Sequence, residues 1–183
     1  MNQFKLLCSL LAISTAMFFH SCSTDDESSK GSYTASCCEI DALTANFDSA
    51  RVFVPNVFTP NGDGINDLLF ILINNKVARI DSFIVRNQRG ESVFKNTDFY
   101  PTYEDDFWDG SLLDGSIDNG IFNYFLTISS INEISMSFTG EVCVRAGLQP
   151  ECVDSEANCI YGVQHDGEGA YDLNIDTSEI LCE

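Results

Sequence analysis

Short apolar runs separated by turn residues dominate the hydrophobic pattern of this chain. Within the runs apolar and polar positions alternate with a period of two, Gly, Asn and Asp interrupt them, and helix-period patterns are scarce. The pattern predicts an all-β fold, and 183 residues with 14 Phe suffice for one core with attachments. Strands are expected at about 52–58, 68–73, 80–86, 92–95, 121–129 and 135–145.

Alternation in the last two predicted strands separates core positions from surface positions. One face of each strand is apolar, and these faces should form the core because successive side chains of a strand point to opposite sides. Cys143 has the opposite parity, so its side chain is expected to point away from the interior. In an oxidising compartment we expect it to form a disulfide. The expected core residues are Phe122, Tyr124, Leu126, Ile128, Met136, Phe138, Val142 and Val144.

Two turns contain glycine next to a polar residue. One lies in the Asn-Gly-Asp-Gly stretch of residues 61–64, and the other, Arg89-Gly90, joins the third and fourth predicted strands. Glycine accepts a positive φ, and Asx side chains bond nearby backbone amides. Both stretches are therefore predicted to be structured turns.

The first of these loops also carries oxygen ligands at alternate positions. Asn61, Asp63 and Asp67 have the spacing by which calcium loops direct several oxygens at one ion, and Asp109 is a fourth candidate. The loop is no EF-hand, because Leu72 stands where a bidentate Glu should follow. A plain Asx-rich turn is the favoured interpretation and a weak calcium site the alternative. No other cofactor is indicated.

Acidic residues surround two aromatic residues in segment 103–110. We expect Trp108 to plug the sandwich while Asp109 caps the following turn. Calcium ligation by Asp105, Asp106 or Asp109 is an alternative.

No group of residues predicts catalysis, so the sequence predicts a protein that is not an enzyme and has no catalytic residue. The carboxylates lack a partner set, and the chain after the signal peptide has one His, His165, and no Gly-x-Ser-x-Gly motif. His165 is expected to face solvent in a turn.

Residues 1–21 have the features of a lipoprotein signal peptide. A Lys precedes an apolar run that is short for a membrane span, and a small residue stands directly before Cys22. Cleavage would leave an acylated Cys22 as an outer-membrane anchor; an ordinary signal peptide is the alternative. The acidic stretch 23–27 resembles a surface-export tag, or is a solvated linker. We interpret residues 22–50 as a tether that becomes an arm lying on the domain.

The charge of the chain limits the kinds of molecule that it can bind. After the signal peptide, eight Lys or Arg stand against 28 Asp or Glu, a net charge of −20. Such a chain repels nucleic acid and anionic lipid headgroups, whereas cations, cationic polymers and basic proteins suit it.

The C-terminal segment 148–183 is acidic and contains three cysteines. Strand-like stretches at 159–163 and 171–175 flank a turn-forming sequence, which predicts a small hairpin pinned to the sandwich by disulfides. Zinc binding by some of the cysteines is the alternative, but their spacing matches no zinc pattern. The disulfide candidates are Cys37, Cys38, Cys143, Cys152, Cys159 and Cys182.

The stretch Val54-Pro-Asn-Val-Phe-Thr-Pro-Asn-Gly-Asp-Gly-Ile-Asn-Asp67 resembles the opening of the gliding motility-associated C-terminal domain, the type B sorting domain of type IX secretion. Arg89 stands where that family usually carries Trp. The resemblance implies an immunoglobulin-like β-sandwich over residues 51–147, exposed on a Bacteroidetes-type cell and without catalysis. Shorter matching motifs follow at 87–91, 93–94, 108–110, 120–126 and 139–145.

Two functional classes follow from these features. In the first, the domain engages the type IX secretion or gliding machinery. In the second, which we favour, the fold serves as a free-standing binding or adhesion module for a surface protein or polysaccharide, since a Cys-rich tail follows the domain and a lipoprotein address makes a second sorting signal redundant.

Overall fold

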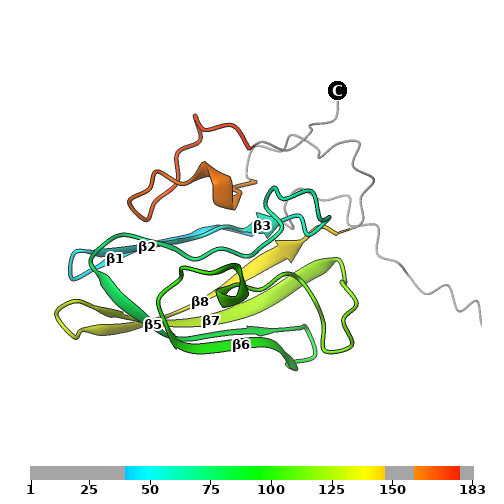
Figure 1. Ribbon diagram of the computed structural model, residues 1–183, viewed down its shortest axis with the longest axis horizontal. Helices are drawn as coiled ribbons and strands as arrows, with labels where there is room; N and C mark the ends of the chain where they lie inside the picture. Colours follow the sequence, from blue (N-terminus) through cyan, green and yellow to red (C-terminus); the bar gives the residue numbers. More distant parts are fainter. Residues whose placement is uncertain (1–39, 147–158, 178–183) are drawn as a thin grey trace, which may run out of the picture. The chain divides into compact units, whose positions relative to one another are not determined.

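The computed structural model describes residues 40–146 and 159–177 (Figure 1). This part of the chain contains eight strands and two 3-10 turns, joined by loops. This confirms the all-β class. The strands are β1 Leu43–Phe47, β2 Ala50–Val54, β3 Val57–Phe58, β4 Leu72–Ile73, β5 Val77–Arg86, β6 Ser92–Phe99, β7 Gly120–Ser130 and β8 Ser135–Val144. The 3-10 turns are η2 Glu104–Asp106 and η3 Gly162–Gln164.

The strands form two sheets. The small sheet has the order β1-β2-β4 and the large sheet the order β3-β8-β7-β5-β6. All neighbours are antiparallel except β3 and β8, which pair in parallel through Val57 with Cys143 and Phe58 with Val144. The predicted strand 52–58 is thus divided, because Pro55 lacks the N–H that would continue the ladder and the chain changes sheet there.

The main core lies between the two sheets. Val52 and Val54 of β2 are fully buried against residues of β5, β7 and β8, and the rings of Phe83 and Tyr124 meet edge to face at 6.4 Å. Seven of the eight expected core residues are buried or half-buried, so the alternation predicted this layer well.

Met136 is the exception, since 42% of it is exposed. Phe138 still contacts the ring of Phe47 in β1, at 5.8 Å between centroids. Met136 lies one alternation closer to the turn that joins β7 to β8. The prediction that it belongs to the core is therefore wrong.

Two further expectations need correction. Residues 43–47, which we placed in an arm, form strand β1 and pair in full with β2. Of the predicted strand 68–73, only Leu72–Ile73 is a strand, and Leu69 makes a single bridge to Trp108 instead.

The predicted C-terminal hairpin is also wrong in detail. Residues 159–177 contain the turn η3 and one isolated bridge, between His165 and Tyr171. Side chains of the sandwich bond the backbone of Ile160 and Val163, so these groups are not available for a hairpin ladder. His165, which we expected to face solvent in a turn, instead forms the bridge to Tyr171 at the edge of the turn; it is half-buried, and its Nδ1 accepts a hydrogen bond from the Gly167 N–H at 3.0 Å.

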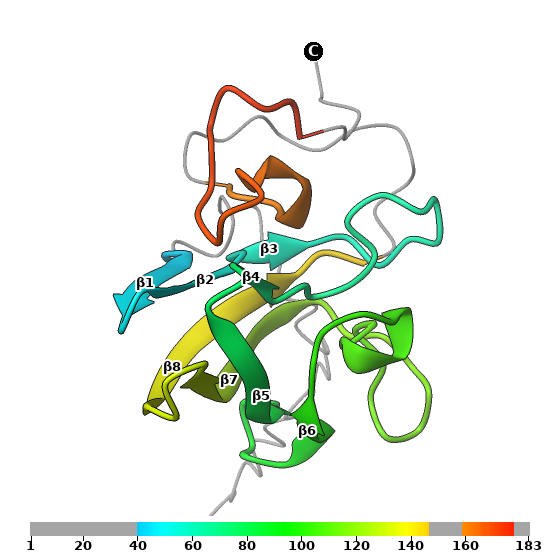
Figure 2. The same cartoon turned by 60° about the vertical axis from the view of Figure 1, so that its left-hand side comes forward.

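The segment 159–177 lies over the small sheet, on the side opposite the large sheet, in both views (Figures 1 and 2). Phe53, which points away from the main core, is fully buried and packs against Tyr171 at 5.7 Å between ring centroids. The small sheet is therefore covered on both faces.

Several predictions concern residues outside the described ranges. These are the signal peptide 1–21, the lipidation site Cys22, the tag 23–27 and the cysteines Cys37, Cys38, Cys152 and Cys182. Within residues 40–146 and 159–177, no helix is long and apolar enough to cross a membrane.

Candidate functional site

The loop 59–67 is organised by one carboxylate. Asp67 accepts hydrogen bonds from the backbone N–H groups of Asn61 at 2.9 Å, Gly62 at 2.8 Å and Gly64 at 2.7 Å. Asp63 accepts a further bond from the Ile65 N–H at 2.7 Å. These contacts confirm a structured Asx-rich turn, since the side-chain oxygens replace the backbone partners of a regular strand.

The same contacts bear on the calcium hypothesis. Among the described residues no group of three or more His, Cys, Asp or Glu could hold a metal ion, so Asp63, Asp67 and Asp109 do not gather into such a group. Asn61 accepts a bond from the Asp63 N–H at 2.9 Å through its side-chain oxygen. Calcium binding by this loop stays a prediction.

Trp108 occupies the position expected of a plug. It is 1% exposed, and its ring meets Phe58 at 5.5 Å and Phe122 at 4.8 Å in edge-on contacts. The indole Nε1–H donates to the Ser111 carbonyl at 2.9 Å, and Asp109 caps the same turn by accepting the Ser111 N–H at 2.9 Å. Both predictions for this pair are confirmed.

The Asp106 side chain bonds backbone groups of its own loop. Its carboxylate accepts the N–H groups of Thr102 at 3.0 Å and Tyr103 at 2.9 Å. These two bonds lower the pKa of Asp106, so it is ionised at neutral pH and acts as a turn-forming acceptor.

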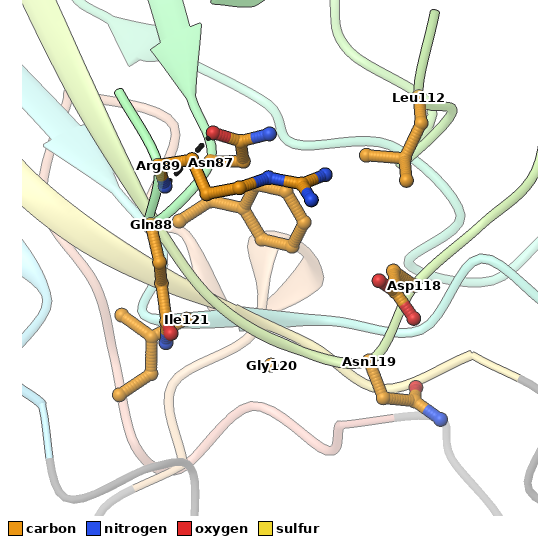
Figure 3. A pocket seen from close by; sticks show the side chains of 9 residues that line it. Asn87, Gln88, Arg89, Leu112, Asp118, Asn119, Gly120 and Ile121 are labelled. Atoms are coloured by element: carbon orange, nitrogen blue, oxygen red, sulfur yellow. Dashed lines mark hydrogen bonds between the residues drawn. The ribbon is translucent and has the colours of Figure 1, made fainter. Parts of the chain in front are cut away.

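The β5–β6 turn and the segment before β7 enclose a pocket of about 250 Å³. Figure 3 shows Arg89 and Asp118 on opposite sides of it, with Leu112 and Asn119 at the rim, and Phe122 also lines it. The turn itself forms as predicted: Gly90 has φ +82°, and Asn87 accepts the Arg89 and Glu91 N–H groups at 3.0 Å each. The pocket therefore combines a cation, a carboxylate and an amide over apolar side chains.

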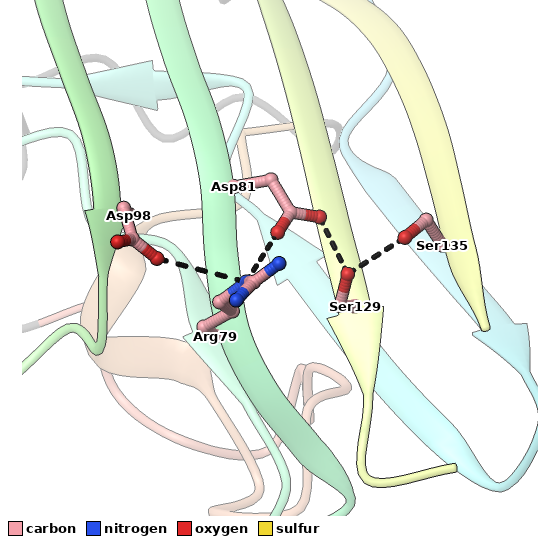
Figure 4. Close-up of polar contacts among 5 residues, drawn as sticks. All are labelled: Arg79, Asp81, Asp98, Ser129 and Ser135. Carbon is pink, nitrogen blue, oxygen red and sulfur yellow. Dashed lines mark hydrogen bonds and ion pairs between the residues drawn. The ribbon is translucent and has the colours of Figure 1, made fainter. Parts of the chain in front are cut away.

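A polar network crosses the large sheet near its other end (Figure 4). Arg79 Nε contacts Asp81 and lies 3.6 Å from Asp98 of β6, while Asp81 accepts the Ser129 hydroxyl of β7 at 2.6 Å. Ser129 also bonds Ser135 of β8 at 2.7 Å. The network ties four strands together and uses its carboxylates for structure.

Two asparagines of the sandwich hold the C-terminal segment. Asn56, 1% exposed, donates from Nδ2 to the Ile40 carbonyl and accepts the Ile160 N–H, both at 2.8 Å. Asn66, 3% exposed, accepts the Val163 N–H at 3.3 Å and donates to the Thr177 carbonyl at 3.1 Å. All four partners are backbone groups.

A second apolar cluster lies beneath these contacts. Val57, Cys143, Cys159 and Tyr161 are all buried in it, with Ile40 packed against them. The parity argument for Cys143 holds, because it is absent from the main core, but its environment is a covered surface. Sequence reasoning missed Asn56 and Asn66 as contact residues; the one available signal was an amide directly after Pro55 inside an apolar run.

Comparison with protein families matches residues 52–142 to one model, the CHU_C type IX secretion signal domain. No curated protein matches the chain. The matched segment runs from within β2 to within β8, so it covers the sandwich apart from β1 and the ends of these two strands, and it ends before the C-terminal segment begins.

Proposed function

Residues 52–142 of this chain belong to the type IX secretion signal domain family, and from this premise we propose that the chain is a non-enzymatic cell-surface protein whose sandwich serves as a binding or adhesion module. The family match ties the domain to type IX secretion and the cell envelope. We also propose that the two-sheet sandwich has an immunoglobulin-like topology. The proposed binding role rests on what surrounds the matched segment.

One observation carries the binding-module proposal: the C-terminal segment is built into the sandwich. Asn56 stands directly before the edge strand β3. Its backbone N–H donates to the Ile160 carbonyl at 3.3 Å, and its side-chain oxygen accepts the Ile160 N–H at 2.8 Å. An unpaired strand edge is the usual place for a partner strand to add. A segment packed beside β3 screens that edge from secretion machinery.

The pocket between Arg89 and Asp118 is the binding surface that we propose. A guanidinium, a carboxylate and side-chain amides offer donors and acceptors to a polar ligand, and the Leu112 and Phe122 side chains offer apolar contact. A sugar unit of a surface polysaccharide matches this mixture. We expect Arg89→Ala and Asp118→Asn each to abolish retention on a polysaccharide that the wild type binds, and unchanged retention of both would contradict the assignment.

We propose that the protein is anchored to the outer membrane through acylated Cys22, with its domain exposed. The proposal rests on the signal-peptide pattern of residues 1–21 and on the small residue before Cys22. Cys22→Ala should move the protein into soluble fractions or leave it as precursor. Unchanged fractionation together with no labelling of the wild type by a fatty-acid probe speaks against it.

We also propose that disulfides join the C-terminal segment to the sandwich. The proposal is supported by the burial of Cys143 and Cys159 together in the second apolar cluster. Each bridge should stabilise the fold by about 2–4 kcal/mol. Mass mapping of the non-reduced protein tests this, and recovery of Cys143 as a free thiol refutes it.

A sorting role is the second candidate, and the family match favours it. The two candidates separate in an export assay in which residues 23–183 follow a periplasmic reporter. The binding-module proposal expects the reporter to stay inside, and expects partial export once the chain is truncated after Gly147. Efficient export of the full fusion, dependent on type IX secretion, favours the sorting role instead.

A further inference from the structure

The surface that holds residues 159–164 contacts main-chain groups of a short segment that is extended at Tyr161 and then turns through η3. Ile160 is bonded through both backbone groups, its N–H to Asn56 Oδ1 and its carbonyl to the Asn56 N–H. Tyr161 has φ −91° and ψ +160°, which is extended backbone. Only the second of the two Ile160 bonds joins two backbones. The Asn66 side-chain oxygen accepts the Val163 N–H, so two asparagine side chains recognise main-chain groups that any peptide sequence offers.

One side chain anchors this segment. Tyr161 is 1% exposed and packs with Val57 of β3 in the second apolar cluster. The next residue, Gly162, packs directly on the Phe70 ring, since a Cβ at position 162 would lie 3.2 Å from a ring carbon. A buried aromatic residue beside backbone bonds is the usual source of affinity in peptide recognition.

Charge adds a second point of recognition. Arg51 of β2 faces the turn 166–170 and lowers the pKa of Asp166 in addition to the backbone bonds there. A Cβ at Gly169 would lie 2.8 Å from the Arg51 carbonyl oxygen, so the turn touches the strand backbone. The segment therefore carries an aromatic anchor followed by an acidic turn that meets a cation.

We infer that Asn56, Asn66 and the space filled by Tyr161 form a peptide-binding site for a short segment with an aromatic anchor followed by a turn, occupied in this protein by its own residues 159–177. The backbone bonds tolerate different sequences, and the Tyr161 position and the acidic turn supply selectivity. The inference concerns this contact alone and does not depend on whether the domain sorts or binds at the cell surface.

The test uses the full chain carrying Cys159→Ser, so that no disulfide holds the segment on the sandwich, and a labelled peptide of residues 158–178 with the same replacement. The otherwise wild-type chain should bind the peptide weakly, because its own segment fills the site and reduces the fraction of competent molecules. Tyr161→Ala empties the anchor position in the chain and should bind the intact peptide about tenfold more tightly. A peptide that also carries Tyr161→Ala should bind neither chain.

A second pair of variants covers the case in which Tyr161→Ala does not fold. Gly167 and Gly169 have φ +79° and +80°, but a Cβ at Gly167 meets nothing within 4 Å, whereas one at Gly169 meets Arg51. Gly169→Ala should raise peptide binding, and Gly167→Ala should leave it near the wild-type value. A folded Tyr161→Ala or Gly169→Ala chain that binds no better than wild type overturns the inference, as does equal binding of the peptide without Tyr161.

Discussion

Strand β2 is covered on both faces, and the two covers differ in kind. Val52 and Val54 face the large sheet, Phe53 faces the C-terminal segment, and all three are fully buried. On the inner face the partners are large apolar side chains of β5, β7 and β8. On the outer face, aromatic contact at Tyr171 is combined with hydrogen bonds that asparagine side chains accept from backbone N–H groups.

Because their contacts differ, the two layers should differ in stability. The inner layer gains from apolar surface removed from water, and it includes aromatic residues such as Trp108 and Tyr124. The outer layer depends on a few polar bonds, each of which contributes modestly when intact and costs more when one buried partner is lost. We therefore expect the C-terminal segment to open without the sandwich unfolding.

The largest expected effect breaks the inner layer. Trp108→Ala removes the ring that contacts Phe58 and Phe122 and leaves a cavity, which should lower the free energy of unfolding by about 3–5 kcal/mol. Chemical denaturation measures it. Tyr103→Ala, in the same loop and 73% exposed, is the control and should change stability by less than about 0.5 kcal/mol. Equal effects of the two variants would show that Trp108 is not a core plug.

The second effect is confined to the outer layer. Asn56→Ala leaves the Ile40 carbonyl and the Ile160 N–H without their side-chain partner, at a cost of about 1–3 kcal/mol. Hydrogen exchange should show faster exchange at Ile160 while the β5 and β7 amides keep their protection.

Asn74 provides the matched control for that variant. It is also buried, but its side chain bonds Ser49, Arg51 and Lys76 within the sandwich. Asn74→Ala should therefore loosen the small sheet and leave the Ile160 amide protected. Loss of protection at Ile160 in both variants would mean that the two layers open together.

The inner layer could be predicted from the sequence because strand parity alone decides it. The alternation in β7 placed Phe122, Tyr124, Leu126 and Ile128 correctly, and the turn at Gly90 followed from its composition. The prediction that Met136 belongs to the core failed because strand parity shows which face a side chain occupies but not how far the opposing sheet extends.

The outer layer could not be predicted in the same way. Residues 159–163 have strand-like composition, and composition does not show that Asn56 and Asn66, about a hundred positions earlier, bond their backbone. Strand β1 was missed because its burial comes from pairing with β2 rather than from a strong apolar pattern of its own. The candidate pocket was likewise missed, because Arg89 and Asp118 are distant in the sequence and only the fold brings them to the same pocket.

A smaller effect is expected in the loop that carries Asn66. Asp67→Ala removes the acceptor of three backbone N–H groups and should destabilise the chain by about 1 kcal/mol, because the loop is largely exposed and water replaces part of the loss. If the loop also binds calcium, calorimetry on the wild type should give millimolar affinity that Asp67→Ala abolishes. No calcium heat, with a melting temperature insensitive to chelator, would leave the loop as a turn alone.

The smallest expected effect is a pH dependence of the outer layer. Bonds from the Ala170 and Glu168 N–H groups, at 3.0 and 2.7 Å, lower the pKa of Asp166 below its ordinary value of 3.8. A carboxyl with a lower pKa in the folded state stabilises that state fully above its unfolded pKa, and this contribution is lost as the pH falls through the folded pKa. Protection of the Glu168 and Ala170 amides should therefore decrease below about pH 4, with the β7 amides unaffected. Asp166→Asn keeps an acceptor oxygen but does not titrate, so its protection should be independent of pH in this range, and a decrease identical to that of the wild type would assign the effect to another group.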